Sequence, residues 1–177
     1  LMTFIKEDIS LTPVQVSIVT AVPVILGSVL RIPIGFYTDR LGARIIFMIS
    51  FLILLFPIFY ISTANTFMDL VIGGLFLGVG GATFSIGVTS LPKYYSKERQ
   101  GFINGIYGIG NAGTAISTFG APILAKSIGW QDTVRLYLIL LFVFIVLLLI
   151  FGDRKEVKVK KSMVEQIQGV YKNATLW

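Results

Sequence analysis

Three residues that are suited to binding an anion are predicted to lie at one depth in a lipid bilayer: Arg31, Phe84 and Asn111. Arg31 lies in an otherwise uncharged run of about 24 residues, which is long enough to span a membrane. An arginine there costs roughly 2.5–3.5 kcal/mol on insertion scales. At about 1.5 Å per helical residue from the nearest loop, Arg31 and Phe84 lie roughly 12 Å deep and Asn111 about 16 Å. All three are therefore expected close to the bilayer midplane.

A cation, an amide donor and an aromatic ring at one level would suit a small planar anion. They offer charge pairing, oriented hydrogen bonds and a stacking face. Spacing alone leaves open whether the three side chains share an interior face. The alternative is a structural arginine that is bonded to backbone carbonyl groups.

The composition indicates an all-α membrane protein. Of the 177 residues, 55% are hydrophobic and 14% are charged, and the mean hydropathy is +0.84. Soluble domains have about 25% charged residues. The net charge of +6 is explained by basic loops on one membrane side rather than by nucleic acid. Cysteine and histidine are absent, so no thiolate site, metal or cofactor is expected.

Hydropathy predicts five spans, over about 14–37, 45–62, 67–92, 101–125 and 133–151. Two of the loops and the C-terminal tail hold most of the basic residues, which predicts that they are cytoplasmic. Residues 1–13 are then an extracytoplasmic loop. Residues 153–177 form a basic cytoplasmic segment with a short amphipathic helix, either on the membrane surface or in solvent. The expected location is the plasma membrane, with the N-terminus of the chain outside.

The third and fourth spans have small residues at spacings of three and four, a pattern that lets helices pack closely. Packing is therefore the alternative explanation for each glycine in these spans. An enzyme is not expected, because the sequence has no nucleophile–base pair, metal cluster or phosphate loop. The pair Gly108 and Gly110 lies within a span rather than after a strand.

The first predicted loop resembles the G-x-x-x-D-R-x-G-R-K loop between helices 2 and 3 of the major facilitator superfamily. The matching residues are Gly35, Asp39, Arg40, Gly42 and Arg44. Ala43 replaces one basic residue of that pattern. The resemblance implies that Asp39 and Arg40 belong to a charge cluster that stabilises one gate state.

Residues 78–113 resemble the nitrate/nitrite porter (NarK-type) family, whose helix 5 has a glycine-rich G-x-G-N-x-G signature. The signature residues here are Gly105, Gly108, Gly110, Asn111 and Gly113. The resemblance implies that Arg31 binds the substrate, Phe84 stacks on it and Asn111 contacts it. Ile106 replaces a second asparagine that some members have, so the polar lining is thinner.

This register implies a partial N-terminal six-helix bundle, with helices 2–6 over residues 14–152. The C-terminal half, which would supply a second arginine and a tyrosine, is missing, so the fragment is expected to be inactive alone. The expected partners are nitrate, nitrite and the lipid bilayer.

Every acidic residue lies at a predicted helix end, in a loop or in the tail. Proton symport commonly uses a carboxylate within the membrane, so this distribution favours nitrate/nitrite antiport. The alternatives are a proton-coupled nitrate symporter, another small-anion transporter, and a membrane subunit or assembly factor.

Overall fold

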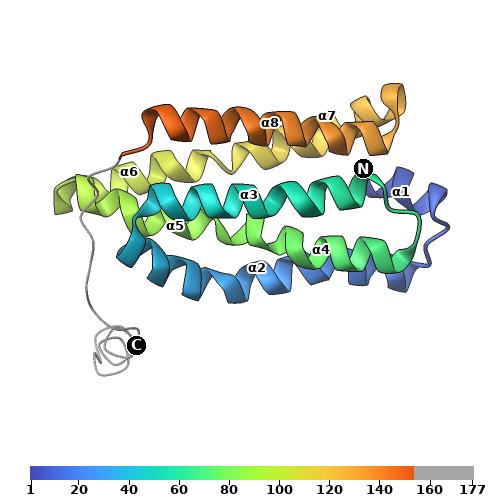
Figure 1. Ribbon diagram of the computed structural model, residues 1–177, viewed down its shortest axis with the longest axis horizontal. Coiled ribbons are helices and arrows are strands. Elements are labelled where there is room, and N and C mark those ends of the chain that lie inside the picture. Colours follow the sequence, from blue (N-terminus) through green and yellow to red (C-terminus); the bar gives the residue numbers. More distant parts are fainter. Residues whose placement is uncertain (154–177) are drawn as a thin grey trace.

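The computed structural model describes residues 1–153, and within them every regular element is a helix (Figure 1). The elements are α1 (Met2–Asp8), α2 (Pro13–Leu41), α3 (Ala43–Ser62), α4 (Phe67–Ala82), α5 (Phe84–Ser90), the 3₁₀ helix η1 (Leu91–Tyr94), α6 (Lys97–Ile109), α7 (Ala112–Ile128) and α8 (Trp130–Phe151). The amphipathic helix expected after residue 153 lies outside the described part of the chain.

Local signals in the sequence determine where two of the long helices begin. The Thr12 hydroxyl accepts the Gln15 N–H at 3.3 Å, and Gln15 Oε1 accepts the Thr12 N–H at 2.9 Å. Thr66 and Asp69 make the same reciprocal pair before α4, at 3.2 and 3.0 Å. Each capping box satisfies two backbone donors that a helix start leaves unpaired. The starts of α2 and α4 are therefore encoded by a few adjacent residues.

The helices run back and forth along one axis, so the bundle has two ends (Figure 1). We call them the α1 end, with α1 and the α7–α8 turn, and the Gly42 end, with the α2–α3 turn and η1. Gly42 has φ 94° and Gly129 has φ 85° at these turns, a backbone conformation that glycine adopts without strain.

Four helical stretches are long and apolar enough to cross a membrane: Pro13–Leu41, Ala43–Ser62, Phe67–Tyr94 and Trp130–Phe151. They overlap four of the five expected spans. The remaining one, 101–125, is not one continuous helix, because α6 and α7 meet at Gly110 and Asn111. Residues 1–13, which were expected to form a loop, contain the helix α1.

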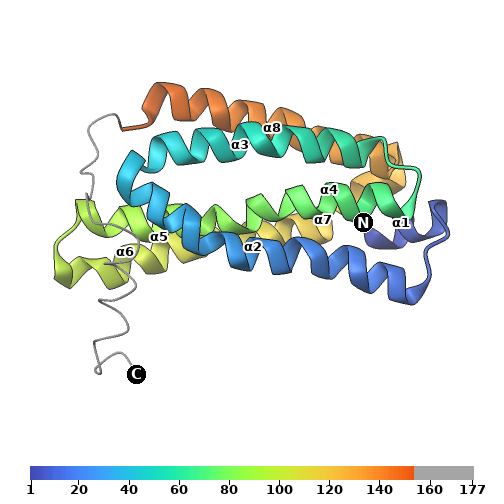
Figure 2. The same ribbon diagram turned by 60° about the horizontal axis from the view of Figure 1, so that its bottom comes forward.

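The helices pack pairwise, with α2 on α4, α4 on α3, α3 on α8 and α8 on α7 (Figure 2). A hydrophobic cluster joins α1 to this series at the α1 end, and it includes Ile5, Leu70 and Trp130. By contrast, α6 has no buried residue. Its position depends on few contacts.

Glycines of α2 and α4 bring the backbones of these two helices into close contact. A Cβ atom added at Gly27 would lie 2.8 Å from the Gly78 carbonyl oxygen and 3.4 Å from Gly81 Cα. One added at Gly78 would lie 2.8 Å from the Pro23 carbonyl oxygen. The backbones are therefore too close for any side chain at these positions.

We predict that Gly78→Ala lowers the free energy of unfolding by about 1–2 kcal/mol, because the extra methyl forces the helices apart. The measurement is thermal unfolding of the purified protein in detergent. Gly74→Ala is the matched control on the same face of α4, since its Cβ would lie 3.6 Å from its nearest neighbours, Pro23 Cδ and the Val19 carbonyl oxygen. A Gly78→Ala protein that melts at or above the wild-type temperature would contradict the prediction.

Candidate functional site

Helix α2 packs against both α4 and α5, and this contact places Arg31 at the level of Phe84. Gly27 lies against Gly81, and a Cβ at Gly35 would lie 3.4 Å from Thr89 Oγ1. Gly27 and Gly35 are as far apart in the sequence as Gly81 and Thr89 are, so α2 keeps one register along α4 and α5. Arg31 lies midway between Gly27 and Gly35 and is therefore level with Ser85, the residue next to Phe84. This register agrees with the depths counted from the sequence.

The Arg31 side chain is exposed, and its guanidinium has no hydrogen bond or ion pair with any residue in 1–153. The alternative of a structural arginine bonded to carbonyl groups therefore finds no support in the described part of the chain. A cation at this depth needs a counter-charge or water, because hydrocarbon solvates it poorly. The arrangement leaves the guanidinium free to bind an anion.

Phe84 is the first residue of α5, and its ring stacks on Tyr107 of α6, with the ring centroids 4.9 Å apart and the planes at 28°. Asn111 lies one helical turn beyond Tyr107, is exposed, and is the residue that precedes α7. The structure thus brings Phe84 next to α6, which ends at Ile109, two residues before Asn111. Tyr107 is not among the residues that the sequence pattern predicts to be functional. The one sequence feature that could have indicated Tyr107 is its position four residues, or about one helical turn, before Asn111.

Both predicted residues with uncharged side chains, Phe84 and Asn111, lie at interruptions of their helices. Near Asn111 the backbone bonds have 3₁₀ spacing, with Gly110 N–H to Tyr107 O and Asn111 N–H to Gly108 O, both at 3.0 Å. Before Phe84, the Thr83 N–H bonds Gly80 O at 3.2 Å and the Thr83 hydroxyl bonds the same carbonyl at 2.7 Å. Short 3₁₀ stretches within helices often mark functional hinges.

Three of the four signature glycines face open space within the described part of the chain. A Cβ at Gly105, Gly108 or Gly113 would meet no atom within 4 Å there, whereas one at Gly110 would lie 3.0 Å from the Tyr107 carbonyl oxygen. Close packing between the described helices therefore does not explain the first three. By contrast, the small residues of the third span do pack, since Gly74 and Gly78 lie against α2.

The residues that match the gating loop connect several elements at the Gly42 end. Asp39 forms an ion pair with Lys93 of η1 at 3.0 Å, with side chains only 21% and 15% exposed. Arg40, the next residue, lies over the Phe36 ring, 5.3 Å from its centroid. The described partner of Asp39 is thus a lysine, and Arg40 contacts an aromatic ring.

Arg44 connects α3 to the last turn of α8. Its Nε donates to the Leu148 carbonyl at 3.4 Å, and its Nη2 donates to the Leu149 carbonyl at 3.0 Å. A cation is favourable at a helix C-terminus, where carbonyl groups are unpaired. Nearby, the Tyr94 hydroxyl donates to Asp153 Oδ2 at 2.8 Å. The loop residues therefore connect α2, α3, η1 and α8.

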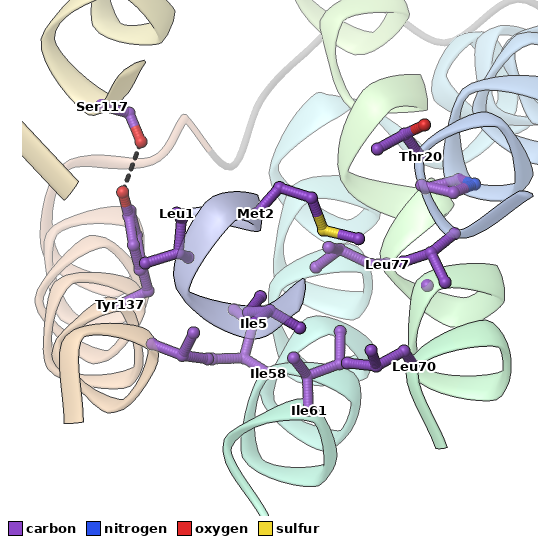
Figure 3. Close-up of a pocket in the computed structure, with 14 residues that line it drawn as sticks. Leu1, Met2, Ile5, Thr20, Ile58, Ile61, Leu70, Leu77, Ser117 and Tyr137 are labelled. Atoms are coloured by element: carbon purple, nitrogen blue, oxygen red, sulfur yellow. Dashed lines mark hydrogen bonds between the residues drawn. The ribbon is translucent and has the colours of Figure 1, made fainter. Parts of the chain in front are cut away.

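A cavity of about 530 Å³ lies at the α1 end, and Leu1, Met2 and Ile5 of the N-terminal segment are on its wall (Figure 3). Its lining is mostly apolar, with a hydrogen bond between Ser117 of α7 and Tyr137 of α8. None of Arg31, Phe84 and Asn111 lines it. The cavity therefore does not coincide with the predicted site.

The fold and these residues define a multi-pass α-helical membrane protein with a cation near mid-depth. The chain belongs to the Major Facilitator Superfamily, whose family model matches residues 1–177. The superfamily membership that the loop at Asp39 predicts is thereby confirmed.

Curated relatives match the whole chain. It is 59% identical over 177 residues to a nitrite extrusion protein of Bacillus subtilis (strain 168), covering 45% of that protein. It is 51% identical to the probable nitrate transporter NarT of Staphylococcus epidermidis and 54% identical to that of Staphylococcus aureus (strain JH9), covering 46% of each. These similarities bear out the resemblance to nitrate/nitrite porters. The chain spans about half the length of the curated relatives it matches.

We predict that burial, rather than distance, decides how strongly two ion pairs stabilise this protein. The Asp39–Lys93 pair should contribute a coupling free energy of about 1–2 kcal/mol, between the values for exposed and for buried pairs. The control pair, Arg135–Asp132, is shorter at 2.8 Å but 51% and 57% exposed, and should contribute less than about 0.5 kcal/mol. Double-mutant cycles with Asn and Met substitutions, read by thermal unfolding, measure both. Equal coupling energies would contradict this prediction.

Proposed function

We propose that the complete transporter containing this chain carries nitrate and nitrite across the membrane. The observation that supports this most directly is the exposed Arg31 guanidinium, which has no partner in residues 1–153 and is level with Phe84. The names of the relatives, a nitrite extrusion protein and probable nitrate transporters, agree with this substrate class.

Each side chain of the proposed site has a distinct chemical task. The Arg31 fork donates parallel hydrogen bonds to two oxygens of a planar anion, which a lysine cannot do. In nitrate, the Asn111 amide donates to the third oxygen. The Phe84 ring packs against the plane of the anion, and its negative face is tolerated because the arginine supplies positive charge nearby.

The proposed site is asymmetric, because the described residues around it supply one cation from one side. We therefore infer that a second half of the transporter supplies further donors to the opposite face of the anion. The lengths of the relatives, of which this chain covers 45–46%, agree with such a half. The chain alone is expected not to transport.

We further propose that the Gly42 end faces the cytoplasm of a cell whose plasma membrane holds the protein. This end has Arg40, Arg44, Lys93, Lys97 and Arg99, whereas the α1 end has Lys6, Lys126 and Arg135. Basic residues close to spanning helices are retained on the cytoplasmic side. The N-terminus of the chain would then lie outside.

Exchange of one anion for the other is the proposed mode of transport. The acidic residues of the described chain lie at helix ends or in connections: Glu7, Asp8, Asp39, Asp69, Glu98, Asp132 and Asp153. None is at the level of Arg31, where a proton site would interact with the anion. A guanidinium without a bound anion is costly in the membrane. Binding of the second anion, which travels in the opposite direction, removes this cost and so favours reorientation of the site.

The alternative is a membrane subunit or assembly factor that does not transport. The exposed glycine face of α6 is compatible with docking a partner helix. Arg31 distinguishes the two functions, because docking through small residues needs no cation at the midplane.

We predict that Arg31→Lys raises the KM for nitrate at least about tenfold, since the charge is kept but the planar fork is lost. The measurement is nitrate/nitrite exchange by the complete transporter in lipid vesicles. Arg135→Lys is the matched control at an exposed surface pair and should leave the KM unchanged. Normal exchange by the Arg31→Lys protein would refute the binding function of Arg31.

We also predict that vesicles loaded with nitrite take up nitrate without any pH gradient. Empty vesicles with an inward proton gradient should show no uptake above background, because no described carboxylate is level with the anion. Uptake that follows the proton gradient and needs no internal anion would replace exchange with proton symport.

A further inference from the structure

The helix that ends at the proposed anion site, α6, is weakly attached to the bundle. It has no buried residue, and added Cβ atoms at Gly101, Gly105 and Gly108 would meet nothing within 4 Å in the described chain. At its start, Gln100 Nε2 donates to the carbonyl groups of Pro92 at 3.0 Å and Tyr95 at 3.4 Å. Some other contact must fix the far end of α6, next to Asn111.

Tyr107 makes that contact, because its ring occupies a notch on α5. One wall of the notch is the Phe84 ring, which is stacked on Tyr107 at 4.9 Å. Its floor is Gly87, one turn later, where an added Cβ would overlap Tyr107 Cζ, Oη and Cε2. Gly87 is buried and has no positive φ. The space required by the tyrosine ring therefore explains why a glycine stands there.

The contact of Tyr107 with the notch determines where Asn111 lies relative to Phe84. Phe84 and Gly87 are about one turn apart on α5. Tyr107 lies in the last turn of α6, and Asn111 follows it by four residues, just past the end of that helix. The backbone just after Tyr107 has 3₁₀ bonds, beginning with Gly110 N–H to Tyr107 O, and such geometry is poorer than that of an α-helix. A side-chain contact is thus needed to hold Asn111 in place. The same contact covers one face of the Phe84 ring, so an anion can approach only the other face or the edge.

We propose that Tyr107 is a positioning residue of the anion site, which it serves by holding α6 in the notch formed by Phe84 and Gly87. The proposal rests on the proposed nitrate/nitrite transport. Tyr107 acts through Asn111 and Phe84 rather than by binding the anion. Its ring makes the stack on Phe84, and the edge of the ring at Cζ, together with the hydroxyl oxygen, lies on Gly87.

The test compares exchange by the complete transporter in lipid vesicles for Tyr107→Ala, Gly87→Ala, the double variant and Tyr107→Phe. The two single Ala variants should each raise the KM for nitrate about tenfold with kcat changed less than about threefold, because a stacked pair is lost or displaced. Tyr107→Phe should stay within about twofold of wild type, because it keeps the ring. Gly80→Ala is the matched control, since its Cβ would lie 3.5 Å from a Leu54 methyl.

In the double variant, Gly87→Ala should add nothing to the effect of Tyr107→Ala, because the small side chain leaves room for the new methyl. Additive effects, an unchanged KM in both single variants, or a Tyr107→Phe protein as impaired as Tyr107→Ala would each overturn the proposal. If the wild-type transporter carries neither anion, the proposed function fails instead. The melting temperatures of the wild type, the two single Ala variants and the double variant then decide whether Gly87 and Tyr107 are coupled, and additive changes would refute the contact itself.

Discussion

The close approach of α2 and α4 is the constraint on which the rest of the structure depends. In a bilayer, apolar side chains gain little by leaving lipid for protein, so helices associate through tight packing of small residues. Gly27, Gly78 and Gly81 allow this packing, with an added Cβ at Gly27 or Gly78 only 2.8 Å from a carbonyl oxygen of the opposite helix. The resulting register carries Arg31 to the level of Phe84. It also brings Asp39 to Lys93 at the Gly42 end.

Polar contacts are distributed unevenly in the described chain, and the distribution has a physical basis. The ion pair of Asp39 and the two bonds of Arg44 lie at the Gly42 end, where water and headgroups solvate charge. Arg31 alone brings a formal charge to mid-depth and leaves it unpaired within residues 1–153. Stability of the bundle therefore depends on helix packing and on its ends, and the charge at the centre remains available for a ligand.

The sequence predicts those features that depend on neighbouring residues in the chain. The capping boxes at Thr12 and Thr66 are recognisable because all their donors and acceptors lie within four positions. The interruption at Asn111 was missed because hydropathy averages over a span, and a break in hydrogen bonding leaves that average unchanged. The partner of Asp39 and the notch for Tyr107 join separate helices, so they depend on a register that no single segment contains. The depth of Arg31 could be counted from the sequence, but its lack of a partner in residues 1–153 could not be predicted.

The notch on α5 also limits the order in which relatives can diverge. A methyl at position 87 cannot coexist with a tyrosine ring in its present place, whereas a smaller residue at position 107 would clash with nothing and leave an unfilled space. Evolution can therefore fill Gly87 only after the ring at position 107 has shrunk, and the reverse path begins with the return of glycine. The two positions can therefore change in either direction but only in a fixed order, and their histories should be read together.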